Sequence, residues 1–346
     1  MNLNSILTES TMINITIFPC AFIASLIGVL LYQNMATKTG IMANPNFRTL
    51  HEAPIPSSGG VVFAFIFVMG VFLLWILDLL SDNLLIILGI GGCAATLLGF
   101  LDDKNNIKAT KKIAMQIFLS GFALFYLDGG PLLNIDLIPS LVAIPLSILF
   151  LVWVINAYNF MDGIDGMAAS GAIFSSGAIV LTMALTNEFS EVTILLLLLA
   201  VSVLAFMVFN WPPAKIFMGD SGSVFLGYIF GVLILFTTMH NEVSIWTWII
   251  VFGYFIADTT VTQIARLILV KKWYLAHRSH AYQNFARITN NHLKVTVWAI
   301  VYYLMWLLPL TIWSVIKPDM AVFATIMALT PASIFSYKYG PVLSIK

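Results

Sequence analysis

The chain has 346 residues, of which 60% are hydrophobic and only 9% charged, and its 16 Lys and Arg residues balance its 16 Asp and Glu residues. A water-soluble domain of this length does not need so large an apolar fraction, so the composition excludes that class and indicates a membrane protein with several spans. No nucleic-acid partner is expected.

Runs of about 20 apolar residues recur along the chain, and a run of that length crosses a bilayer as an α-helix. Backbone groups must be satisfied within lipid, and these runs lack the alternation of barrel strands. We therefore predict an all-α, polytopic integral membrane protein, a single domain over residues 1–346, with about 11 transmembrane helices. The predicted spans are 13–33, 59–80, 84–101, 112–127, 138–156, 167–186, 190–209, 222–238, 244–268, 295–315 and 321–336.

The basic residues predict the orientation of these spans. If the N-terminus lies outside, every Lys and Arg except Lys317 falls at the opposite end of the bundle. The positive-inside rule makes that end cytoplasmic, which places the N-terminus in the periplasm and the C-terminus in the cytoplasm. Topology alone explains the positive face, which also suits anionic lipid head groups or a phosphorylated substrate.

The first cytoplasmic gap, "NPNFRTLHEAPIPSSGG", covers residues 44–60. Pro54 and Pro56 prevent a regular helix there. The gap is either an ordinary loop or a flap that brings Arg48 and His51 to an anionic ligand.

The second gap contains "LDDKNN", in which Asp102 and Asp103 follow a long apolar run. Carboxylates at this depth need a hydrated surrounding, and two neighbouring carboxylates stay ionised together only beside a cation, either Mg²⁺ or a nearby Lys. Adjacent residues lie about 100° apart on a helix, so the two side chains should face different partners. One is expected to bind metal and the other to handle a proton.

The third gap, "NAYNFMDGIDG", places Asn156, Asn159, Asp162 and Asp165 at intervals of three. A step of three residues rotates about 300° around an α-helix, so four such residues cannot share one face unless the helix tightens or unwinds. We predict that the helix ends near Asn159 and that Asp162 and Asp165 lie in a broken segment facing a cavity.

The fourth gap, "NWPPAKIFMGDSGS", places Asp220 directly before an apolar span. A helix N-terminus there offers free N–H groups and a positive dipole end, and a simple helix cap is the alternative interpretation. Asp258 lies within a later span, where an ionisable residue indicates function by default. Pairing with Arg266 is its structural alternative.

The last loop, "KKWYLAHRSHAYQNFARI", contains His277, Arg278, His280 and Tyr282. Two histidines without a third ligand nearby make a zinc site a weak interpretation. Arg278 can fork onto a phosphate and Tyr282 can stack or hydrogen-bond, so we expect phosphate or sugar recognition. This loop and the sparse acids at the same end of the bundle together predict a site for Mg²⁺ and a diphosphate.

Three segments, "LDDKNNIKATKKIAMQ", "NAYNFMDGIDG" and "NWPPAKIFMGDSGS", closely resemble the polyprenyl-phosphate N-acetylhexosamine-1-phosphate transferases, over about residues 44–290. The resemblance implies an enzyme of the bacterial inner membrane with its site on cytoplasmic loops and helix ends. Its expected reaction transfers a sugar 1-phosphate from a UDP-N-acetyl amino sugar to undecaprenyl phosphate and releases UMP. The implied cofactor is Mg²⁺, with Mn²⁺ as an alternative, and a homodimer is left open.

The resemblance also implies the roles of individual residues. The catalytic set is Asp102, Asp103, Asp162 and Asp165. The metal set is Asp220 and Asp103. Expected substrate contacts are Lys112, Gln116, Asn156, Asn159, and, for uridine, Asn210 and Phe217, to which the loops add Arg48, His51, His277, Arg278, His280 and Tyr282.

One segment departs from the pattern of the cell-wall translocases, which carry three adjacent histidines in the last loop. This chain has "HRSHAYQ" there. We therefore do not expect a pentapeptide-bearing substrate. The sequence looks more like the branch that initiates O-antigen synthesis, which uses N-acetylfucosamine, N-acetylquinovosamine or, in some members, N-acetylglucosamine.

A different class of function is a proton-coupled transporter that uses membrane Asp residues as relays. Such a protein is expected to place acids near the midplane in broken helices of both halves. The acids of this chain instead gather at the predicted cytoplasmic ends of the spans, which favours the transferase.

Overall fold

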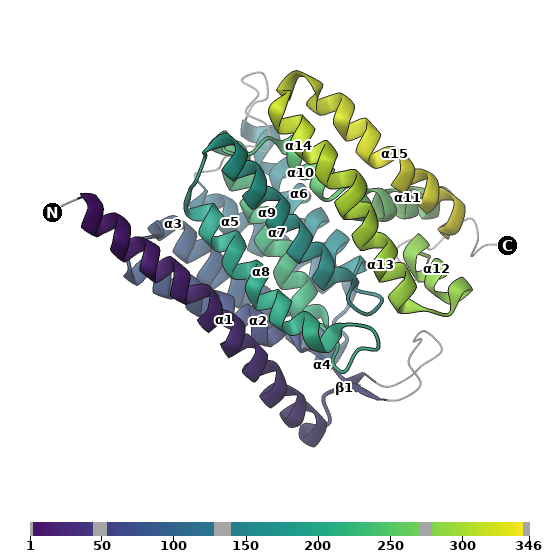
Figure 1. Ribbon diagram of the computed structural model, residues 1–346. Helices are drawn as coiled ribbons and strands as arrows, with labels where there is room; N and C mark the ends of the chain where they lie inside the picture. Colours follow the sequence, from purple (N-terminus) through teal and green to yellow (C-terminus); the bar gives the residue numbers. More distant parts are fainter. Residues whose placement is uncertain (1–2, 44–53, 128–139, 270–278, 342–346) are drawn as a thin grey trace.

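The computed structural model describes residues 3–43, 54–127, 140–269 and 279–341 (Figure 1). In the first part of the chain the helices are α1 (Leu3–Thr39), α2 (Gly60–Ile76), α3 (Asp82–Leu84), the π-helix η1 (Leu85–Ile90), α4 (Gly91–Asn105), α5 (Ala109–Tyr126) and α6 (Ser140–Phe160). The next are α7 (Met167–Thr186), α8 (Glu191–Asn210), α9 (Asp220–Met239), α10 (Ile245–Val251) and α11 (Gly253–Leu269). The last are α12 (Ala281–Thr289), α13 (His292–Tyr302), the π-helix η2 (Tyr303–Leu307), α14 (Leu308–Ile316), the 3₁₀ helix η3 (Pro318–Met320) and α15 (Ala321–Tyr339).

Among these described residues the one regular element other than helix is a short antiparallel pair of strands. Met42 of β1 (Met42–Ala43) pairs with Pro56 of β2 (Ile55–Pro56). The pair lies at the same end of the bundle as α12 (Figure 1). The prediction of an all-α, polytopic membrane protein is therefore confirmed, with this minor addition.

Within the described ranges, eight helices are long and apolar enough to cross a membrane, and a ninth span results if α10 and α11 are joined across their 80° bend. Two other predicted spans coincide with α2, a shorter apolar helix, and α5, whose first turn carries Lys111 and Lys112. Each predicted range therefore overlaps a helix, but the count of eleven spans is not confirmed.

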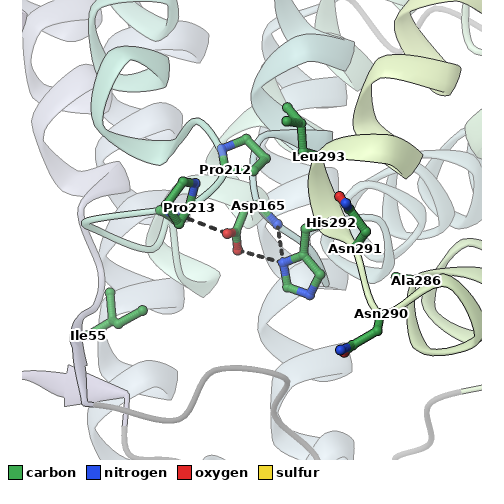
Figure 2. Close-up of a pocket in the computed structure, with 10 residues that line it drawn as sticks. Ile55, Asp165, Pro212, Pro213, Ala286, Asn290, Asn291, His292 and Leu293 are labelled. Carbon is green, nitrogen blue, oxygen red and sulfur yellow. Dashed lines mark hydrogen bonds and ion pairs between the residues drawn. The ribbon is translucent and has the colours of Figure 1, made fainter.

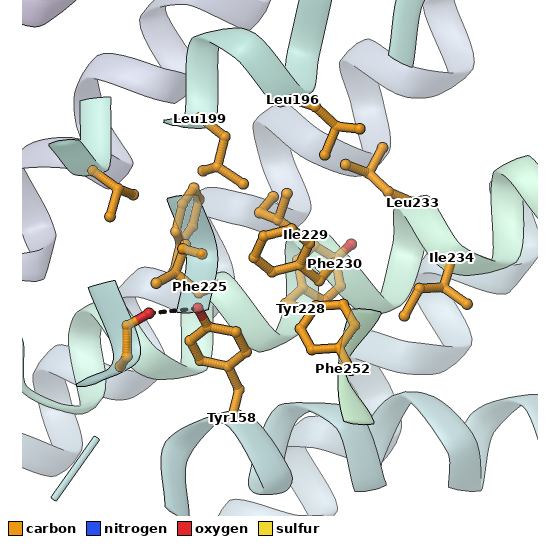
Figure 3. Packing of buried hydrophobic residues seen from close by; sticks show 14 of the residues in the cluster. Tyr158, Leu196, Leu199, Phe225, Tyr228, Ile229, Phe230, Leu233, Ile234 and Phe252 are labelled. Carbon is orange, nitrogen blue, oxygen red and sulfur yellow. Dashed lines mark hydrogen bonds between the residues drawn. The ribbon is translucent and has the colours of Figure 1, made fainter. Parts of the chain in front are cut away.

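Helix α9 is the core of the bundle. All of residues 221–237 are buried, because α2, α4 and α6 pack against it from different sides. A helix that is apolar all round requires such a position. On the α6 side, the ring of Tyr158 stacks on Phe230 with centroids 5.7 Å apart, and Phe252 lies edge-on to Phe230 at 5.1 Å (Figure 3).

Two glycines allow neighbouring helices to touch the start of α9. A Cβ added to Gly99 of α4 would overlap the backbone of Asp220 and Ser221, and one added to Gly60 of α2 would overlap Gly222. The ends of α2 and α4 consequently meet the N-terminus of α9 at backbone contact distance. This meeting point positions the polar residues that follow Gly99 on α4.

We expect Gly99→Ala to lower the stability of the protein by about 1–3 kcal/mol, the usual cost of forcing extra atoms into a packed contact. The melting temperature of the detergent-solubilised protein measures the change. Gly121→Ala is the matched control, because a Cβ at Gly121 of α5 meets nothing within 4 Å. Equal melting temperatures for both variants would contradict the close contact between α4 and α9.

Candidate active site

Asp103 ends α4 against the first turn of α9. Its Oδ1 accepts a hydrogen bond from the backbone N–H of Asp220 at 2.8 Å, and its Oδ2 accepts one from the N–H of Ser221 at 3.2 Å. Ser58 donates its hydroxyl to Oδ2 at 2.6 Å. The first N–H groups of a helix have no partner within the helix, and its dipole favours a negative charge there. Asp103 therefore caps α9 from a different helix.

The segment that carries Ser58 is fixed to the loop before α9. Phe217 donates its N–H to the carbonyl of Pro56 at 2.8 Å, and Gly59 donates to the carbonyl of Phe217 at 2.9 Å. Gly219, with φ of 73°, completes the approach, because a Cβ on it would overlap the carboxylate of Asp103. These backbone bonds hold the Ser58 hydroxyl against Asp103.

Asp102 faces a different direction from Asp103, as predicted. Its Oδ1 accepts the N–H of Ile107 at 2.7 Å, and its Oδ2 forms an ion pair with the ammonium of Lys112. The same ammonium lies 3.5 Å from Oδ2 of Asp220. Lys112 thus bridges the carboxylates of Asp102 and Asp220 at the ends of α4 and α9.

The second acidic motif breaks where the sequence predicted. Helix α6 ends at Phe160, α7 begins at Met167, and the turn between them, residues 161–166, contains Asp162 and Asp165. On the last turn of α6, the amide of Asn159 donates to Oδ1 of Asp220 and to the hydroxyl of Ser223, each at 2.9 Å. One turn earlier, Asn156 donates to the side-chain carbonyl of Gln116 at 2.7 Å.

Asp162 contributes an unpaired carboxylate to the same end of the bundle. Its side chain accepts no hydrogen bond from any described residue. Burial, together with the charges of Asp220, Asp103 and Asp165, raises the pKa of Asp162 well above its ordinary value. A carboxylate so placed gains from a nearby cation, which would offset the repulsion by the other three.

Asp165 lies on the other side of the turn, against a pocket of about 400 Å³ (Figure 2). Its Oδ1 lies 3.0 Å from Nδ1 of His292, and its Oδ2 accepts the N–H of Ala214 at 3.0 Å. Asn290 and Asn291 line the pocket beside His292. The two oxygens of Asp165 are thus committed to contacts within the protein, whereas those of Asp162 have no such contact among the described residues.

The expected uridine contacts are Asn210, the last residue of α8, and Phe217, in the loop before α9. Asn210 is buried, accepts the N–H of Gly166 at 3.0 Å and donates to the carbonyl of Ile216 at 2.9 Å. Its side chain therefore ties the 161–166 turn to the loop before α9. Phe217 is half-buried in that loop. Gln116 is buried against Asn156.

Of the last loop the structure describes His280 and Tyr282, because His277 and Arg278 lie outside the described residues. Arg48 and His51 of the first gap also lie outside them. Tyr282 is fully buried and donates its hydroxyl to the carbonyl of Phe160 at 2.6 Å, which fixes the end of α6. His280 is buried with Nδ1 3.6 Å from Oδ1 of Asp258.

Asp258 caps a second helix from a distance. Its Oδ1 accepts the N–H of Ala281 at 3.0 Å and its Oδ2 accepts that of Tyr282 at 3.2 Å, so it binds the first turn of α12. Arg266, the partner considered from the sequence, donates to the hydroxyl of Ser279 at 3.3 Å. Asp258 therefore has a structural role in setting the position of α12.

The sequence did not single out two residues that contact the acids: Ser58, which binds Asp103, and His292, which binds Asp165. Ser58 precedes Asp103 by 45 residues, and His292 follows Asp165 by 127 residues. No local spacing links such distant pairs. The signal that was available for His292 is its position directly after "NN" at the start of an apolar span.

Comparison with known proteins identifies the family of the chain. Residues 85–238 match the family model described as glycosyl transferase family 4. A probable undecaprenyl-phosphate N-acetylglucosaminyl 1-phosphate transferase of Bacillus subtilis (strain 168) is 31% identical over 287 residues, covering 79% of this chain and 78% of the relative. The chain belongs to glycosyl transferase family 4.

Another relative in the same comparison is a phospho-N-acetylmuramoyl-pentapeptide-transferase of Streptococcus pneumoniae (strain CGSP14). It is 31% identical over 261 residues, which cover 69% of this chain and 76% of the relative. The glycosyl transferase family 4 match includes all the acids proposed for the site from the sequence, namely Asp102, Asp103, Asp162, Asp165 and Asp220.

We expect Asp103→Ala to destabilise the fold more than Asp102→Ala. Loss of a helix cap costs about 1–2 kcal/mol, and Asp103→Ala leaves the N–H groups of Asp220 and Ser221 without their acceptor. After Asp102→Ala, one N–H group, that of Ile107, loses its acceptor, and Lys112 keeps Asp220 as a partner. Thermal unfolding of the two variants measures the difference. A larger loss for Asp102→Ala would contradict the capping role of Asp103.

Proposed function

We propose that the protein transfers an N-acetylhexosamine 1-phosphate from a UDP-sugar to undecaprenyl phosphate, with release of UMP. The observation that carries the proposal is the ammonium of Lys112 between the carboxylates of Asp102 and Asp220, at the ends of membrane helices. Both named relatives support it, since each is named as a transferase of a phosphorylated sugar or its 1-phosphate. The catalytic end is proposed to face the cytoplasm of a bacterial inner membrane.

In this reaction an oxygen of the lipid phosphate attacks the phosphorus next to the sugar. The bond from that phosphorus to the UMP oxygen breaks, and undecaprenyl-diphosphate sugar forms. Phosphoryl transfer depends on in-line positioning and on neutralised oxygens. Lys112 supplies positive charge to the phosphates, and the carboxylate of Asp102 is proposed to accept a proton from the lipid phosphate.

The residues fit a Mg²⁺ ion bound together with a diphosphate. Among the described residues no three His, Cys, Asp or Glu side chains converge closely enough to enclose a metal by themselves. Mg²⁺ uses one or two carboxylates and completes its shell with water and substrate phosphates, so a cage is not required. Asp220 and Asp162 would hold the ion, which would neutralise diphosphate oxygens. Asp103 is committed to α9 through three hydrogen bonds, so we now propose it as a positioning residue.

The pocket beside Asp165 is proposed to receive part of the nucleotide. It lies next to the turn that carries Asp162, and the side-chain amides of Asn290 and Asn291 offer donors and acceptors to a base or ribose. Phe217 lies on the adjacent loop and Asn210 at the end of α8, and their role near uridine stays a proposal from the sequence. The sugar is proposed to be N-acetylfucosamine, N-acetylquinovosamine or N-acetylglucosamine, in the initiating step of O-antigen or a related surface glycan.

The test is turnover by the purified protein in detergent with undecaprenyl phosphate, Mg²⁺ and separate UDP-sugars. We expect UMP release and a lipid-linked product with at least one N-acetylated amino sugar. A panel of UDP-sugars identifies the preferred substrate. Absence of lipid-linked product with every sugar would overturn the proposal. Proton-coupled solute uptake into proteoliposomes would instead support the transporter.

We expect Asp220→Asn to lower turnover by about 100-fold or more, because an amide is a poorer ligand for a divalent cation and no longer balances Lys112. Titration with Mg²⁺ should show a higher half-saturating concentration in any residual activity. Asp319→Asn, at an exposed acid of η3, is the control and should behave as the wild type. A near-normal rate for Asp220→Asn would remove this residue from the metal site.

A further inference from the structure

The 161–166 turn is braced by a segment far away in sequence. At its start, the hydroxyl of Tyr282 binds the carbonyl of Phe160 at 2.6 Å. At its end, Thr296 donates its hydroxyl to the carbonyl of Asp165 at 2.7 Å. Between them, a Cβ on Gly163 would overlap the side chains of Tyr282 and Gln283. The part of the chain from α12 to the start of α13 therefore touches the turn along its length.

Within this brace, the side chain of His292 contacts the carboxylate of Asp165. Its Nδ1 lies 3.0 Å from Oδ1 of Asp165 and 3.5 Å from the backbone nitrogen of the same residue. A carboxylate only accepts hydrogen bonds, so the shorter contact is a bond when Nδ1 carries the hydrogen. Oδ2 of Asp165 meanwhile accepts the N–H of Ala214. The carboxylate is thus held between two elements.

The backbone around His292 leaves its ring little freedom. His292 is the first residue of α13, and the preceding Asn291 caps that helix by accepting the N–H of Lys294 at 2.8 Å. The N-terminus of α13 favours a negative charge beside it, which suits the carboxylate of Asp165. The side chain of His292 is only 20% exposed, and its Nε2 is buried without a hydrogen-bond partner among the described residues.

The turn that His292 supports also carries Asp162, three residues before Asp165. The peptide N–H of Gly166, the next residue, binds Asn210, and the peptide N–H of Asp162 binds the carbonyl of Asn159. Because the turn has so few bonds of its own, its shape depends on contacts from outside. Releasing Asp165 would allow Asp162 to move away from the cluster around Lys112.

We propose that His292 is a positioning residue of the transferase, which acts through Asp165 to hold the 161–166 turn and thereby Asp162 in place. The expected effect of His292 on the rate rests on the proposed function. Its expected effect on the shape of the turn rests on the contacts alone. His292 touches neither Lys112 nor Asp220 in this arrangement, so its effect is indirect. It links the pocket of Figure 2 to the acidic cluster.

The test compares His292→Ala and His292→Asn in the full-length protein. Asn can place an N–H donor where Nδ1 of His292 lies, whereas Ala cannot. We expect His292→Ala to lower kcat by about tenfold to hundredfold, the range for a lost hydrogen bond to a charged group, with KM for the lipid phosphate little changed. His292→Asn should recover most of kcat. His240→Ala, at the opposite end of α9, is the matched control and should retain wild-type kcat.

A second readout does not depend on turnover. Hydrogen–deuterium exchange of the peptide that contains residues 161–167 should be faster in His292→Ala and near wild type in His292→Asn. In a double-mutant cycle, His292→Ala should add little to the effect of Asp165→Asn, because both changes remove the same interaction. An unchanged melting temperature in His292→Ala would separate positioning from a general loss of folding.

The outcomes separate this proposal from the proposed function. A wild-type protein without transferase activity overturns the proposed function, while the exchange experiment still decides whether His292 holds the turn. Wild-type exchange and wild-type kcat in His292→Ala would overturn the role of His292. So would a His292→Asn variant as impaired as His292→Ala, because the restored donor would then have no effect.

Discussion

The contact between the carboxylate of Asp103 and the first turn of α9 is the interaction on which the site depends. It satisfies two N–H groups that a helix cannot satisfy itself, and it places a negative charge at the positive end of the helix dipole. Gly99 makes the contact possible by letting α4 approach α9 at backbone distance. Once Asp103 is fixed there, the direction of Asp102 follows from the helix, since adjacent side chains diverge by about 100°. Asp102 is thereby turned toward Lys112 and Asp220.

The same device recurs at α12, where Asp258 of α11 binds the first turn. A carboxylate within a membrane span commonly indicates a transport or relay function. Here each of the two acids instead neutralises the start of another helix, which accounts for a buried negative charge without a proton pathway. Both caps act next to the 161–166 turn, since Asp220 contacts Asn159 and Tyr282 contacts Phe160 at the end of α6. One fixes Asp220 and the other fixes Tyr282, so the turn lies between two anchored helix starts.

Local sequence patterns predicted those parts of the structure that depend on neighbouring residues. The apolar runs, the break after Asn159, the divergence of Asp102 and Asp103, and the position of Asp220 at a helix start all follow from helix periodicity. The partners of these residues do not, because they come from other helices. Asn210, expected at uridine, joins two loops, and His292 reaches Asp165 across 127 residues. The 80° bend between α10 and α11 also has no local signal beyond Gly253.

The charge that remains after capping suggests why the cluster has this composition. With Asp103 committed to α9 and Asp165 to His292, the carboxylates that remain for a ligand in the described part of the site are those of Asp102, Asp162 and Asp220. Lys112 balances one of them. A divalent cation would favour the ionised form of Asp162, whose pKa is raised, and would balance the remaining carboxylates, whereas a diphosphate alone would be repelled. The cluster is therefore suited to bind a cation and an anionic substrate together rather than either one separately. This mutual requirement would restrict the proposed transfer to the complex in which both are present.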